Sequence, residues 1–142
     1  MKEEKCACRG GSLMRFVQPL LLTILCESPD HGYELVQKIG TTRLWQEARP
    51  DAAGVYRVLR DMEARGLITS HLDADSKAGM GKRVFSITDA GRACMKNWLA
   101  TLLEYRAGIG DVIDRLEACI PDAGQPCPTC CCEHSPNDDK ED

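Results

Sequence analysis

The feature that most constrains the fold is a change in the spacing of apolar residues half-way along the chain. In the first half, apolar residues recur every three or four positions in three segments, 16–25, 33–39 and 55–62, which predicts three helices. In the second half, residues 67–72 and 82–87 have strand-like composition and are joined by a glycine-containing loop. The predicted fold class is therefore mainly α with one small β-hairpin, in the α+β class.

Three helices followed by a hairpin are the order of a winged helix-turn-helix. In that fold the third helix enters the major groove of DNA, and the hairpin touches the flanking backbone. Turn residues support the boundaries, because Ser28-Pro29-Asp30 predicts the end of the first helix and Gly66 predicts the end of the third. Binding to double-stranded DNA is therefore the leading hypothesis.

A long helix is predicted after the hairpin, with Thr88-Asp89 as its N-terminal cap. Its apolar stripe is too long to be buried on so small a domain, so we expect a second copy of the chain to cover it in a homodimer. Gly108 and Gly110 weaken the middle of this helix and predict a bend or a break there. The predicted dimerisation residues are Met95, Trp98, Leu99, Leu102, Ile109, Val112, Ile113 and Leu116.

Charge and composition predict a soluble, cytoplasmic protein. The formal net charge is −4, yet residues 121–142 alone hold six acidic residues and one lysine, which leaves the rest of the chain nearly neutral. No apolar run is long enough to cross a membrane, and residues 1–12 lack a secretory pattern. The predicted segments are a cysteine-bearing arm at 1–12, a DNA-binding domain at 13–88, a dimerisation helix at 89–120, and an acidic tail at 121–142 that is flexible unless it binds metal.

The third predicted helix supplies candidate DNA contacts. Arg57 and Arg60 lie one helical turn apart and share a face, from which they could reach base edges or phosphates. Tyr56 could donate a hydrogen bond to a phosphate. The alternative is that both arginines are solvated and pair with Asp61 or Glu63, while Tyr56 packs in the core.

The predicted hairpin carries a second group of cations. Lys77, Lys82 and Arg83 cluster around its loop, where they would lie against backbone phosphates and add affinity that falls as the salt concentration rises. The alternative for this group is a solvated hairpin with no DNA contact.

Three stretches of the sequence match a known family in that family's order across residues 13–103. They are His31-Gly32-Tyr33-Glu34-Leu35, then Gly54-Val55-Tyr56 with Leu59 and residues 63–67, then Phe85-Ser86-Ile87-Thr88-Asp89-Ala90-Gly91. On these motifs the chain resembles the PadR family of winged-helix transcriptional regulators. The resemblance implies a dimeric repressor of operator DNA with a C-terminal dimerisation helix, and it adds Gly54 to the DNA-binding residues. Ala52-Ala53 stands where many relatives have proline and glycine.

Nine cysteines in a reducing compartment indicate metal, cluster or redox chemistry rather than structural disulfides. Cys127-x-x-Cys130 has a chelating spacing, and Cys6-x-Cys8 forms a second pair of donors at the other end of the chain. Thiolates accept zinc, another soft metal or metalloid, or an iron–sulfur cluster, and the spacing does not choose among these cofactors. The candidate metal ligands are Cys6, Cys8, Cys127, Cys130, Cys131 and Cys132, with His134 as a weaker candidate.

Other interpretations of these residues stay open. The adjacent thiols could form a redox switch without metal, or the tail could have no specific role. Some PadR relatives bind flat drugs between aromatic side chains at the dimer interface, so a small organic effector is an alternative, although Trp98 is predicted to pack. A thiol-based redox enzyme or metal carrier is disfavoured, because no C-x-x-C opens a helix after a strand. We therefore predict a regulator without enzymatic activity whose DNA affinity depends on metal, cluster or thiol state.

Overall fold

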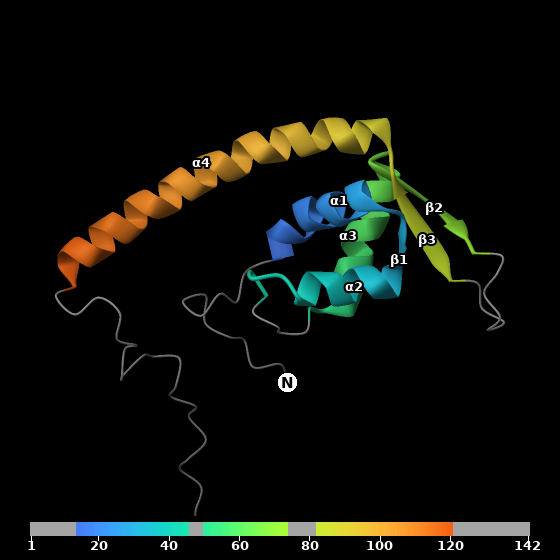
Figure 1. Cartoon of the computed structure of the whole chain (residues 1–142), viewed down its shortest axis with the longest axis horizontal. Helices are drawn as coiled ribbons and strands as arrows, with labels where there is room; N and C mark the ends of the chain where they lie inside the picture. The colour runs from blue at the N-terminus through green and yellow to red at the C-terminus, as the bar shows by residue number, and fades with distance from the viewer. Residues whose placement is uncertain (1–13, 46–49, 74–81, 121–142) are drawn as a thin grey trace, which may run out of the picture. The chain divides into compact units, whose positions relative to one another are not determined.

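The computed structural model describes residues 14–45, 50–73 and 82–120 (Figure 1). Contacts divide the chain into two units: residues 13–103 form one, and residues 104–119 belong to the other. The three predicted helices, the hairpin and the long helix after it are confirmed. After a 3-10 turn at Met14–Phe16 the elements are α1 (Val17–Glu27), β1 (Asp30–His31), α2 (Gly32–Gly40), α3 (Ala52–Ala64), β2 (Ile68–Leu72), β3 (Arg83–Ile87) and α4 (Asp89–Cys119).

The sheet has three antiparallel strands in the order β1-β3-β2. Strands β2 and β3 form the predicted hairpin, with Ile68 opposite Ile87 and Leu72 opposite Arg83. Strand β1 was not predicted, because two residues are too few to give an alternating pattern. It pairs Asp30 with Phe85, and so it joins the start of α2 to the hairpin.

The core lies between α1, α2, α3 and the sheet, and it fixes which side of each helix faces outward. In α3, Leu59 and Met62 are fully buried, whereas Arg57 and Arg60 on the other side of the helix are exposed. Tyr33 is one of the apolar residues at helical spacing in 33–39, a pattern that predicts burial, but this prediction was wrong, since 59% of the residue is exposed. Tyr33 lies about 100° around α2 from the buried Gly32, which turns it away from the core. The buried apolar residues are Val17, Leu21, Leu22, Leu25, Leu35, Ile39, Trp45, Val55, Leu59, Met62, Ile68 and Phe85.

Helix α4 begins at the predicted cap. The Thr88 hydroxyl accepts a hydrogen bond from the Gly91 N–H at 3.1 Å and donates one to the Gly66 carbonyl at 2.6 Å. Gly66 has a φ of +76° and ends α3, as predicted. Thr88 therefore satisfies a free N–H at the start of α4 and also ties α4 to the turn that follows α3.

Helix α4 is one continuous helix through Gly108 and Gly110, so of the two predicted alternatives, a bend or a break, the break was wrong. Glycine lowers helix propensity by about 1 kcal/mol, but unlike proline it keeps its N–H donor and causes no clash. Across the described ranges, no helix is both long and apolar enough to span a membrane.

Candidate nucleic-acid interface

A groove of about 650 Å³ lies between the first turn of α2, the exposed side of α3, and β3. We call it the α2–α3–β3 groove. Three cations and one carboxylate line it, so its formal charge is positive, and this favours an anionic ligand. The residues that line it are His31, Gly32, Tyr33, Tyr56, Arg60, Glu63, Lys82, Arg83 and Phe85.

The two arginines of α3 are available for a partner. Arg57 and Arg60 are exposed, and neither makes an ion pair or hydrogen bond with another described residue. Asp61, an expected partner, instead pairs with Arg65 at 3.0 Å. Glu63, the other expected partner, accepts a hydrogen bond from Ser70. Within the described part of the chain, therefore, neither Asp61 nor Glu63 pairs with Arg57 or Arg60.

Tyr56 lies at the surface, with 39% of the residue exposed, and not in the core. Its ring lies over the start of α2, where a Cβ on Gly32 would be 2.5 Å from Tyr56 Cε1. Only glycine leaves room for the phenol in this position. The side chain therefore forms part of the wall between α2 and α3 and stays accessible from the groove.

The hairpin is linked to α3 by side chains of both its strands. Arg83 Nη1 donates to Ser70 Oγ at 2.9 Å, and Ser70 Oγ donates to Glu63 Oε1 at 2.6 Å. This chain of hydrogen bonds holds Arg83 at the edge of the groove. Lys82 beside it is exposed, whereas Lys77 lies outside the described residues.

Gly54 differs from the other predicted contacts because it is buried. A Cβ there would lie 2.8 Å from Met14 Cε and 3.1 Å from Asp51 Oδ2. We therefore assign Gly54 a packing role at the start of α3, where a larger residue would push against these side chains.

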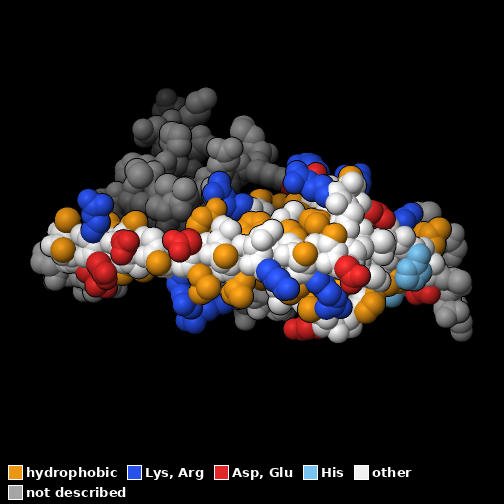
Figure 2. Space-filling view, turned by 90° about the horizontal axis from the view of Figure 1, so that it is seen from above, with side chains coloured by type: hydrophobic (Ala, Val, Ile, Leu, Met, Phe, Trp, Pro, Cys, Tyr) orange, Lys and Arg blue, Asp and Glu red, His pale blue; other side chains and the backbone are white. Residues whose placement is uncertain are grey.

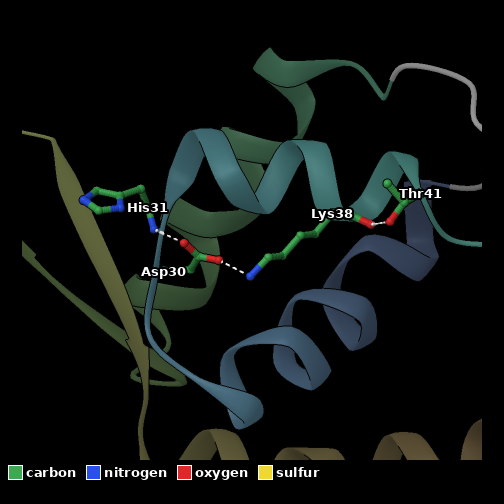
Figure 3. A network of polar contacts seen from close by, with 4 residues as sticks. All are labelled: Asp30, His31, Lys38 and Thr41. Carbon is green, nitrogen blue, oxygen red and sulfur yellow. Dashed lines mark hydrogen bonds and ion pairs between the residues drawn. The ribbon is translucent and has the colours of Figure 1, made fainter.

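A polar network fixes α2 beside the groove (Figure 3). The Asp30 carboxylate accepts a hydrogen bond from the His31 N–H at 2.9 Å, and Lys38 reaches back along α2 to pair with the same carboxylate. This hydrogen bond from Lys38 to Asp30 raises the pKa of Lys38 above its usual value, because the contact favours the charged ammonium. His31 Nε2 also lies 3.1 Å from Asp73 Oδ2, which links the start of α2 to the end of β2.

The chain has the order of helices and strands and the exposed cations that are typical of a winged helix. Sequence comparison identifies the family of the chain. The model of the PadR-like family of transcriptional regulators matches residues 21–97, more than half of the chain. The chain belongs to this family. A search of curated proteins gave no match.

Solved structures agree with the fold of this PadR-like chain. A candidate transcriptional regulator from Thermoplasma acidophilum is 29% identical, with 72% of this chain and 94% of the other covered and a TM-score of 0.63. A PadR-like regulator from Bacillus cereus is 21% identical, with coverage of 71% and 94% and a TM-score of 0.59. PadR of Bacillus subtilis, solved in complex with operator DNA, is 21% identical, with coverage of 60% and 46% and a TM-score of 0.51.

The predicted dimerisation stripe divides into two parts along α4. Met95 and Trp98 pack against the core of their own chain, and the Trp98 indole N–H donates to Gln18 Oε1 at 2.7 Å. Trp98 is thus held against the core of its own chain, and its role at a dimer interface stays a prediction. Leu102 is half-buried. The other stripe residues are large exposed hydrophobics, and Figure 2 shows hydrophobic side chains along α4; they are Leu99, Ile109, Val112, Ile113 and Leu116.

The predicted metal ligands Cys6, Cys8, Cys127, Cys130, Cys131 and Cys132, together with His134, lie outside the described residues, so metal binding stays a prediction. In the ranges that are described, no group of three or more His, Cys, Asp or Glu residues could hold a metal ion. Cys26 and Cys94 are half-buried and Cys119 is exposed. Arg92 Nη1 donates a hydrogen bond to Cys26 Sγ at 3.2 Å.

Proposed function

We propose that this PadR-like chain is a homodimeric repressor that binds double-stranded operator DNA in the cytoplasm. In each subunit α3 enters the major groove, and the β2–β3 hairpin lies against backbone phosphates. The two copies of α3 read two half-sites related by the two-fold axis of the dimer. The contacting residues are Tyr56, Arg57, Arg60, Lys77, Lys82 and Arg83.

The observation that carries this proposal is the outward position of Arg57 and Arg60. Burial of Leu59 and Met62 fixes the rotation of α3, so both guanidinium groups project from its exposed side. Neither is neutralised by another described residue, and Arg60 lines a groove of positive formal charge. Exposed, unpaired arginines on the third helix of a winged helix suit base edges and phosphates.

Selection from a pool of random DNA duplexes tests this proposal. We expect the protein to enrich an inverted repeat, because a two-fold symmetric dimer binds two equivalent half-sites. The enriched site, placed in a reporter promoter, should lower transcription when the protein is expressed. Failure to enrich any sequence would contradict operator binding, and a rise in transcription would contradict repression.

The homodimer is supported by the exposed apolar residues of α4. Ile109, Ile113 and Leu116 recur every three or four positions, and about half of each is exposed in the single chain. Ile113→Glu would bury an unpaired charge in a dimer interface formed by these residues. We expect it to raise the dissociation constant of the dimer at least tenfold, which corresponds to about 1.4 kcal/mol.

Sedimentation equilibrium measures this dissociation constant directly. Ala107→Glu is the matched control. It adds the same charge at an exposed position of α4 that is about 200° around the helix from Ile109, and therefore away from the apolar side. An Ile113→Glu variant that dimerises as tightly as the Ala107→Glu variant would show that this side of α4 does not form the interface.

The terminal cysteines are the proposed sensor. Their chelating spacing supports a site that holds zinc, another soft metal or an iron–sulfur cluster, and adjacent thiols support a redox switch as the alternative. Ligand or redox state would change the separation of the two α3 helices and thereby the operator affinity. Metal and acid-labile sulfide analysis of protein purified without oxygen distinguishes the three chemistries.

The double variant Cys127→Ser with Cys130→Ser tests the sensor. We expect its operator affinity to become independent of added metal and oxidant, because two thiolate donors are lost. Cys119→Ser, which removes an exposed cysteine outside the proposed ligand set, should keep the wild-type response. If the double variant responds like the wild type, these two cysteines are not part of the sensor.

A further inference from the structure

Tyr33 is an exposed aromatic residue beside the cations of the α2–α3–β3 groove. More than half of the residue is exposed, although its place in an apolar pattern favours burial. Arg60, Lys82 and Arg83 line the same groove. An exposed phenol offers a hydroxyl to a polar partner, and it stands here where a negatively charged partner is attracted.

The hydrogen bonding of Tyr33 determines what its hydroxyl can do. Gln37, one turn later in α2, donates its Nε2–H to Tyr33 Oη at 2.6 Å. Since the phenol oxygen accepts this bond, its own O–H hydrogen is directed elsewhere and is free to be donated. No described residue accepts this hydrogen: the hydrogen bond from Gln37 is the one the structure shows at the Tyr33 hydroxyl within the described residues.

We propose that the Tyr33 hydroxyl donates a hydrogen bond to a phosphate of the DNA backbone and that Gln37 holds the phenol in position for it. This inference rests on the proposed function. A phosphate oxygen accepts hydrogen bonds and carries the charge that Arg60, Lys82 and Arg83 attract. Tyr33 thereby adds a contact from α2 to those from α3 and the hairpin, and this contact contributes affinity and register without reading the sequence.

Tyr33→Phe removes only the hydroxyl and leaves the ring. Hydrogen bonds to charged groups are among the stronger ones, so we expect the affinity for the selected operator to fall about tenfold. The same fall should appear on unrelated DNA, because phosphates are common to all sequences. Tyrosine is neutral and releases no counterion, so the dependence of the affinity on salt concentration should be unchanged. Tyr105→Phe, on α4, is the matched control and should bind like the wild type.

Two further measurements separate a phosphate contact from a structural role. Operator DNA with a neutral methylphosphonate at the contacted phosphate should be bound equally by the wild type and Tyr33→Phe. Gln37→Met should weaken binding in the wild-type background and have no effect in the Tyr33→Phe background, since Gln37 acts through the phenol. Thermal unfolding of Tyr33→Phe should match that of the wild type.

The outcomes distinguish this inference from the proposed function. If the wild type enriches no DNA, the proposed function fails. If the wild type binds its operator and replacing Arg57 and Arg60 weakens that binding, while Tyr33→Phe binds as tightly as Tyr105→Phe, the assignment of Tyr33 is overturned and the proposed function stands. The assignment is also overturned if Tyr33→Phe binds more weakly than the wild type to every operator duplex with a single methylphosphonate, whichever phosphate is replaced.

Discussion

Gly91→Ala is expected to lower the free energy of unfolding by about 3 kcal/mol, the upper end of the cost of overpacking. A Cβ at this position would collide with the carbonyl oxygen of Leu67 and lie 2.7 Å from Ile87 Cγ1. The carbonyl cannot move away freely, because it accepts a hydrogen bond from the Thr88 N–H at 3.1 Å. The substitution therefore forces the first turn of α4 away from the strands.

Gly108→Ala is the matched control for this prediction. It is in the same helix, and a Cβ there meets no atom within 4 Å. Because alanine favours a helix more than glycine does, we expect this variant to be more stable by up to about 1 kcal/mol. Urea unfolding followed by circular dichroism measures both variants. Equal destabilisation by the two substitutions would contradict the close approach of α4 to Leu67.

Replacing both Arg57 and Arg60 by alanine is expected to lower operator affinity at least a hundredfold, because the double substitution is present in both subunits of the dimer. Each arginine that reaches a base edge contributes about 1–3 kcal/mol of discrimination, and 1.4 kcal/mol corresponds to a factor of ten. The salt dependence identifies the role of each residue. Loss of a phosphate contact lowers the slope of log K against log salt concentration by about 0.9, whereas loss of a base contact relaxes the sequence preference at one position.

Arg65→Ala is the control for the arginine variants. Arg65 lies at the C-terminal end of the same helix, and Asp61 already neutralises it. We expect its removal to change the affinity less than twofold, since an exposed ion pair contributes little. Fluorescence anisotropy with the selected duplex measures both variants. If Arg65→Ala weakened binding as much as the double variant did, the lower affinity would result from the loss of positive charge in general. It would then not show that the exposed side of α3 contacts DNA.

Much of the fold could be predicted from the sequence because its signals are local. Helical spacing located α1, α2 and α3, and alternation located the hairpin. Strand β1 was missed because Asp30 and His31 are strand residues only through their pairing with β3, which no local pattern records. Tyr33 was assigned to the core because a pattern of apolar residues does not show where the buried stripe of a nine-residue helix ends.

The candidate site was predictable in part. The burial of Leu59 and Met62 implies that Arg57 and Arg60 face outward, and the structure agrees. The hydrogen bonds from Arg83 through Ser70 to Glu63 could not be predicted, because they join residues that only folding brings together.

The groove with its two phenols could not be predicted either. Tyr33 and Tyr56 lie on different helices. They line the same groove because of the way α2 packs on α3 and because Gly32 has no side chain. For the terminal cysteines, spacing remains the basis of the prediction.

The most direct test of the central claim, that α3 and the hairpin bind operator DNA, is the salt dependence of the affinity of the wild-type protein for its selected duplex. A dimer whose two hairpins contact phosphates through Lys77, Lys82 and Arg83, with Arg57 and Arg60 adding contacts to phosphates or bases, predicts a slope of log K against log salt concentration between about −5 and −9. A slope near zero would contradict it, because the exposed cations of α3 and β3 would then have released no counterions and could not be the DNA-binding surface.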